Sequence, residues 1–159
     1  GMVNIECTAL TVAISVFSTC LFAQDAESDT FRDWKVVCTE SQQCRITQSV
    51  VQTATNQPIL VVRAFVEDQP TLLLTFPLGV LLSPGWAYQV DDARPTTLPF
   101  EICNPVGCHV GVPLDAGLLN GMQKGRNMKI TFFDAERTEV APVVSLLGFT
   151  AAWEALRNK

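Results

Sequence analysis

Short runs of alternating apolar and polar residues, separated by turn residues, dominate the chain from about residue 30 onwards. Trp86, Tyr88 and Val90 alternate with small or polar residues, which is typical of a strand buried on one face. The stretch 59–66 is β-branched and almost wholly apolar, as in a core strand, and Arg63 within it is expected to point to an open face or edge. Further strands are expected at 31–38, 44–52, 71–76, 98–103, 108–112, 128–132 and 139–145.

Two segments instead repeat their apolar residues at helical spacing. A short helix is expected near 114–124, although two glycines within it lower its helix propensity. Asp115 would lie near its start, where a negative charge suits the helix dipole. A C-terminal helix is expected near 146–157, with one apolar face and Ser145 as its N-cap.

Many short strands between Gly and Pro turns, without regularly alternating helices, predict an all-β fold, either a sandwich or a barrel. The chain has 159 residues, of which 48% are apolar and 17% charged, enough apolar side chain for one core. It contains no internal repeat, low-complexity tract or linker. Residues 31–159 are therefore expected to form a single domain of this class.

The first 23 residues resemble an export signal, once Gly1 is set aside as a cloning remnant. An apolar run at 9–17 leads to a proposed cleavage point after Ala23, and the polar stretch 24–30 is expected to be a flexible mature N-terminus. The absence of Lys and Arg before the run is atypical. A buried helix or strand of the domain, lipidation at Cys20 and a membrane anchor remain alternatives.

Four of the six cysteines lie outside this leader, which suggests two disulfides in an oxidising compartment. The pairs Cys38–Cys44 and Cys103–Cys108 are favoured, because each flanks a short loop that costs little to close. A four-thiolate zinc site is the competing interpretation, but Cys-x5-Cys and Cys-x4-Cys are wider than the usual zinc pairs. No Cys-x-x-Cys redox motif is present.

The distribution of charged residues does not favour binding to a polyanion. The net charge is −5, and Lys and Arg are scattered singly rather than in a basic run. Nucleic acid and anionic lipid are therefore not expected as main partners, and membrane contact is expected only through a retained leader. The leader and the cysteines together predict export from the cytosol to an oxidising compartment.

The candidate catalytic residues have simpler structural interpretations. His109, the only histidine, is read as a strand-face or loop residue, and Ser145 lacks the glycine that precedes the serine of a nucleophile elbow. Asp91 and Asp92 are adjacent and would face opposite ways on a strand, so they form no convergent acid pair. We therefore expect no enzyme, no cofactor and no metal site. Large aromatic residues are expected in the core rather than in a pocket, namely Trp34, Trp86 and Trp153.

Four fragments in order carry a family resemblance. They are Trp34–Cys38 followed by Cys44–Gln48, then Phe76–Val80, Cys103-x4-Cys108, and Ser145–Ala152. Together they resemble the invasion-associated locus B family of alphaproteobacteria, from Trp34 to Leu156. The resemblance implies an exported protein of the periplasm, the outer envelope or the exterior of the cell, with residues 31–159 as a single immunoglobulin-like β-sandwich domain. In pathogens the family is linked to entry into host cells, notably erythrocytes, whereas other members occur in free-living bacteria. The family provides no catalytic residues to carry over.

The expected function is a non-catalytic envelope module that acts by protein–protein contact through exposed loops or a sheet edge. Its partner would be a host-surface protein in a pathogen and an envelope component otherwise. The alternative is a periplasmic carrier of a small apolar ligand or lipid, suggested by the surplus of apolar residues over 59–82. An extra apolar cavity would favour the carrier, and a packed core would count against it.

Overall fold

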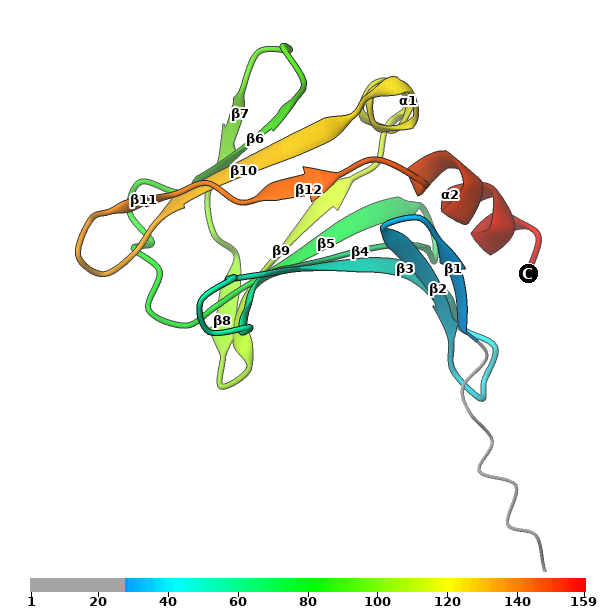
Figure 1. Cartoon of the computed structure of the whole chain (residues 1–159), viewed down its shortest axis with the longest axis horizontal. Helices are drawn as coiled ribbons and strands as arrows, with labels where there is room; N and C mark the ends of the chain where they lie inside the picture. The colour runs from blue at the N-terminus through cyan, green and yellow to red at the C-terminus, as the bar shows by residue number, and fades with distance from the viewer. Residues whose placement is uncertain (1–27) are drawn as a thin grey trace, which may run out of the picture.

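The structure is a computed structural model that describes residues 28–159. The expected export signal at 1–23 and residues 24–27 lie outside the described residues. The described chain folds into two antiparallel sheets and two short helices, which confirms the expected β-sandwich (Figure 1).

The larger sheet has the order β1-β2-β3-β4-β5-β9-β8. Five consecutive strands form a meander, and β9 and β8 extend it beyond β5. The term immunoglobulin-like therefore describes the two antiparallel layers and not the strand order. The bounds are β1 Ser28–Phe31, β2 Trp34–Cys38, β3 Cys44–Val51, β4 Pro58–Val66, β5 Pro70–Phe76, β8 Ile102–Asn104 and β9 Gly107–Pro113.

The smaller sheet has the order β11-β10-β6-β7, and β12 also pairs with β10. The expected strand at 139–145 is divided at Ala141 and Pro142, and the one at 98–103 is interrupted after Leu98, where Pro99 lacks a backbone donor. The bounds are β6 Trp86–Val90, β7 Thr96–Leu98, β10 Asn127–Phe133, β11 Glu139–Val140 and β12 Val143–Ser145.

The start of the domain differs from the expectation. The expected strand at 31–38 is two strands joined by a turn in which Arg32 has a φ of +54°, so the chain reverses there. Residues 28–30, expected to be flexible, pair with β2, and Ser28 lies opposite Val37. This pairing supplies hydrogen bonds that the polar composition of the segment does not reveal.

Alternation along the strands fills the space between the sheets with apolar side chains. Leu60, Val62 and Ala64 of β4 are buried, as are Met128, Ile130 and Phe132 of β10. Phe76 lies at the centre of an aromatic cluster, with ring centroids 5.5 Å from Trp86, 5.0 Å from Phe100 and 5.2 Å from Phe132. The expected core tryptophans, Trp34, Trp86 and Trp153, are all buried.

Two helices close one end of the sandwich (Figure 1). Helix α1 spans Ala116–Lys124, and the side chain of Asp115 caps it by accepting a hydrogen bond from the Leu118 backbone at 2.8 Å. Helix α2 spans Phe149–Arg157 and lays Phe149 against Trp34, with centroids 5.2 Å apart. Among the described residues, no helix is long and apolar enough to cross a membrane.

The prediction that Ser145 caps α2 is wrong. The N-cap is Gly148, which has a φ of +86° and no side chain to accept a hydrogen bond, and Ser145 lies at the end of β12. The Ser145 hydroxyl accepts instead from the Leu147 backbone at 3.2 Å. Three residues of irregular chain thus separate the strand from the helix, and their conformation depends on the packing of Gly148.

A side-chain bridge joins the two sheets near that point. The Ser145 carbonyl accepts from Trp34 Nε1 at 2.8 Å and from Gln48 Nε2 at 2.9 Å, and the Ser145 N–H donates to Gln48 Oε1 at 2.9 Å. The Gln48 amide therefore pairs with β12 as a neighbouring strand's peptide group would. We call these three contacts the Ser145 bridge.

Gly148→Ala is expected to lower the free energy of unfolding by about 2–4 kcal/mol, through overpacking and a left-handed backbone. A Cβ at residue 148 would overlap the Phe31 carbonyl. Gly121→Ala is the matched control: a Cβ there meets nothing within 4 Å inside α1, so stability should rise by about 0.5–1 kcal/mol. Urea denaturation measures both, and equal effects would contradict this account of Gly148.

Candidate functional site

The four body cysteines form two disulfides, each across the ends of one hairpin. Cys38 lies opposite Cys44 with 2.07 Å between the sulfurs, and Cys103 lies opposite Cys108 with 2.05 Å. These are the pairs that the short loops favour. In residues 28–159 no three His, Cys, Asp or Glu side chains gather as a metal ion would need.

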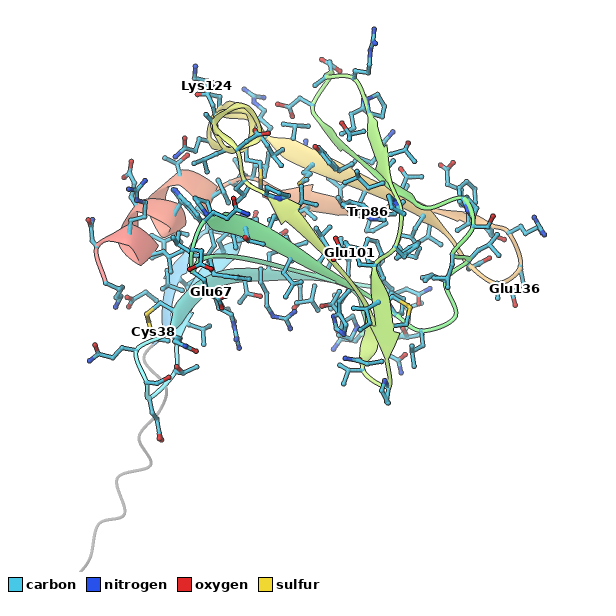
Figure 2. All side chains as sticks on the ribbon, turned by 180° about the vertical axis from the view of Figure 1, so that it is seen from behind. Cys38, Glu67, Trp86, Glu101, Lys124 and Glu136 are labelled. Atoms are coloured by element: carbon cyan, nitrogen blue, oxygen red, sulfur yellow. A yellow bond between two sulfur atoms is a disulfide. The ribbon has the colours of Figure 1, made fainter. Side chains whose placement is uncertain are left out.

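The stapled hairpins bracket the outer face of the larger sheet. In Figure 1 this sheet arches, and the β2–β3 and β8–β9 hairpins project from opposite ends of the arch, away from the smaller sheet. Figure 2 shows a disulfide near each end and Trp86 between the layers. The two staples thus hold loops in place at both limits of one open surface.

A chain of hydrogen bonds crosses that outer face. Arg63 Nη1 donates to Thr75 Oγ1 at 3.1 Å, and Thr75 Oγ1 lies 3.0 Å from His109 Nδ1. His109 Nε2 lies 3.1 Å from Asn104 Oδ1, which also accepts from the Val106 and Gly107 backbones. The donors and acceptors match when Thr75 donates to Nδ1 and a proton on Nε2 donates to Asn104. His109 therefore lies on strand β9, as expected.

The hydroxyl of Thr75 and the imidazole of His109 resemble the nucleophile and general base of an acyl-transfer enzyme, but their surroundings do not suit that reaction. The third group is the Asn104 amide, whose oxygen is already shared with the hairpin turn. Strand β5 is paired on both sides, by β4 and β9, so the backbone N–H groups near Thr75 are used within the sheet. Donors aimed at a developing oxyanion would have to come from elsewhere. The chain of hydrogen bonds acts as a cross-strand tie between four strands.

An open groove of about 870 Å³ lies at the end of the sandwich that carries α2. Its walls come from the 39–43 loop, strands β3 to β5, the turn between β4 and β5, and the end of α2. The groove is cationic, with one carboxylate, from Glu67 (labelled in Figure 2), among its lining residues. The lining cations are Arg45, Arg63, Arg157 and Lys159, and the principal apolar residues are Phe65, Val66, Leu73 and Leu156.

Arg45 and Arg63 form the cationic centre of the groove. Arg63 lies opposite Thr47, and Arg45 precedes Thr47 by two residues, so the two arginines are diagonal neighbours on the outer face. Burial lowers the pKa of Arg63, and the positive charge of Arg45 lowers it further. Within residues 28–159, neither guanidinium has a carboxylate within 4.0 Å. An anionic ligand would relieve their mutual repulsion.

Exposed large apolar side chains are frequent on two segments that meet at the other end of the sheet. In the described residues, four of the eight exposed large apolar residues lie on the Cys103–Cys108 hairpin or on the 77–85 loop. Val106 is 80% exposed and Ile102 is 64% exposed. The loop begins beside the hairpin because Phe76 pairs with Cys108, and it contributes Leu78 and Leu82. We call these four residues the hairpin patch.

The remaining acidic candidates are structural or exposed. Asp91 accepts from the Asn127 backbone at 3.0 Å and from the Arg126 backbone at 3.1 Å, which ties the end of β6 to the start of β10. It is therefore more than the solvated loop residue that was expected. Asp92 is exposed, and the two carboxylates form no acid pair.

Neither the groove nor the hairpin patch is predicted by the sequence pattern. Arg63 was predicted only to point to an open face or edge of an apolar strand, and nothing was predicted for Arg45. Their pairing depends on the register between β3 and β4, which no local pattern specifies. The available signal for the patch was Pro105-Val106 inside the predicted disulfide loop, an apolar residue at a turn.

Comparison with known proteins identifies a family and a solved structure of similar fold. Residues 34–157 match the family described as "Invasion associated locus B (IalB) protein". The fold matches the crystal structure of invasion associated protein B from Bartonella henselae, with a TM-score of 0.74 and 22% identity over 83% of this chain and 96% of that one. A comparison with curated protein sequences gives no match.

Non-reducing peptide mapping of the protein from its native source should yield the Cys38–Cys44 and Cys103–Cys108 peptides, with no free body thiol. The Cys103→Ser/Cys108→Ser double variant should lose about 2 kcal/mol of unfolding free energy, because its small loop is no longer closed in the unfolded chain. Four titratable thiols, or zinc that co-purifies with them, would contradict the disulfide assignment.

Proposed function

The chain belongs to the invasion associated locus B (IalB) family, and on that premise we propose that it is an exported module that works by binding another protein. The matched region covers nearly all of the described domain. The chemistry of the domain agrees with a binding role, because its histidine and nearby hydroxyl tie strands together. The proposal includes no cofactor and no catalytic step.

The hairpin patch is the observation that carries this proposal. Monomeric proteins bury most large apolar side chains, and clusters that stay exposed often mark contact sites. Here Ile102 and Val106, the two most exposed of the four residues, lie on a hairpin whose ends are joined by a disulfide and whose turn is held by Asn104. A hairpin held in this way loses little conformational freedom on binding, which favours affinity.

The proposed location is the periplasm, the outer envelope or the exterior of the cell. Two disulfides in one small domain support an oxidising compartment, and the pattern of residues 1–23 supports export. In a pathogen the partner would be a host-surface protein, in keeping with the name of the Bartonella henselae protein of similar fold. In a free-living bacterium it would be an envelope component.

The alternative of a periplasmic carrier for a small apolar ligand has less support. The apolar surplus over 59–82 that suggested it is used largely in the core, where Leu60, Val62, Leu72, Leu74 and Phe76 are buried. The groove is cationic at its centre, which does not suit a neutral apolar ligand.

Photo-cross-linking tests the contact surface. A photoreactive residue in place of Val106 should give a discrete adduct with one partner in native envelopes or host membranes, because that side chain projects into the contact. The matched control is Val143, which is 49% exposed and lies on the smaller sheet. Val106→Asp should abolish co-purification of that partner. Identical adducts from both positions, or none from 106, would reject the hairpin patch.

Export is tested separately by fractionation and N-terminal sequencing in the native bacterium. The mature chain is expected in the envelope or the medium, and it should begin at Gln24 after cleavage. Replacing Ala23 with Arg should block processing and leave the uncleaved precursor, because the cleavage site requires a small residue. Recovery of a fully reduced protein from the cytosol would refute the proposed compartment.

A further inference from the structure

The cationic groove is distinct from the hairpin patch and opposite in charge to the protein as a whole. The side chains give a net charge of −5, yet four basic side chains and one acidic side chain line the groove. Lys159 already pairs with Asp29 at 3.3 Å. Arg45 and Arg63 have no such partner in the described residues, although their own charges repel each other. The structure therefore concentrates unneutralised charge at one place.

The free donors of the two guanidiniums lie beside apolar side chains. Arg63 commits Nη1 to Thr75, and the other N–H groups of its planar fork can still bind an anion. Leu73 lies directly opposite Arg63, and Phe65 follows Arg63 by two residues on the same face of β4. Two residues along a strand span about 6.6 Å, so Arg63 and Phe65 stand about one dipeptide step apart, and Leu73 flanks them on the neighbouring strand.

We propose that this groove binds an extended acidic segment of a partner protein. An Asp or Glu of the segment would bind Arg45 and Arg63 through its carboxylate, and an apolar residue two positions away would pack on Phe65 and Leu73. Side chains two residues apart on an extended peptide face the same way, which matches the spacing on the sheet. This inference rests on the proposed protein-contact function and adds the chemistry of the partner.

The charge distribution favours a peptide over an anionic membrane surface. Adsorption to anionic lipid typically uses an exposed cluster of several Lys and Arg residues. Here the cations line one groove of an acidic protein, so a flat anionic bilayer would meet the repulsive surface as well. A narrow segment would touch the groove alone. The volume of about 870 Å³ lies in the range of sites that hold compact ligands.

Fluorescence anisotropy with the full, oxidised chain tests the proposal. The probe is a labelled, end-capped hexapeptide of alternating Glu and Leu, and the comparison peptide carries Gln in place of Glu. The Glu peptide should bind, and the Gln peptide should bind at least tenfold more weakly. Raising the salt concentration should weaken binding of the Glu peptide, because exposed charges are screened.

Variants assign that binding to the two arginines. Arg45→Gln/Arg63→Gln should weaken binding of the Glu peptide at least tenfold. Arg94→Gln/Arg137→Gln, which removes the same charge from exposed positions outside the groove, should change it less than twofold. If the double variant folds poorly, Arg45→Glu provides the test instead, because Arg45 is exposed and its replacement should not disturb the fold. It should weaken binding even more than Arg45→Gln.

Three results would overturn the inference: equal binding of the two peptides, no effect of Arg45→Glu, or binding only to phosphatidylglycerol vesicles. The last would assign the groove to a lipid headgroup. The cross-link from residue 106 distinguishes failure of the acidic-segment proposal from failure of the proposed protein-contact function. If that cross-link persists while the groove variants have no effect, the protein-contact role stands without the acidic segment.

Discussion

The Ser145 bridge is the constraint on which the arrangement of the two sheets depends. Strand β12 has only three residues and pairs with β10 on one side, so its other edge needs donors and acceptors. Gln48 and Trp34 provide them from the inner face of the larger sheet. The chain then turns through Gly148, which packs against the Phe31 backbone, and places Phe149 on Trp34. The position of α2 follows from these contacts.

That arrangement uses the inner face of the larger sheet for packing and leaves the outer face for contact. The inner positions of β4 and β5 are buried, whereas Arg63, Phe65 and Leu73 remain partly exposed between them. No second layer covers the outer face in the described residues, and a disulfide-stapled hairpin stands at each of its limits (Figure 1). A rigid scaffold with loops held at its ends is a common design for binding.

The two candidate contacts on this scaffold differ in chemistry. The hairpin patch offers apolar area, which contributes affinity, whereas the groove offers paired guanidiniums, which contribute selectivity and faster encounter with an acidic partner. Their positions at opposite ends of one sheet would let a single extended partner reach both. The tie from Arg63 through Thr75 and His109 to Asn104 runs between them, so His109 has a structural place in this surface.

Local patterns in the sequence determined the all-β class, the inner faces of the strands, both helices and the two cysteine pairs over short loops. Those features depend on residues close together in the chain, where the spacing of apolar residues indicates a strand or a helix directly. Tertiary structure decided the pairing of 28–31 with β2, the role of Ser145, and the diagonal placement of Arg45 and Arg63. The first pairing spans at most nine residues, and the polar composition of 28–30 hides it. The other two depend on register and on contacts across about 20 to 110 residues, because a side chain's neighbours across a sheet are set by how strands align and not by its own segment.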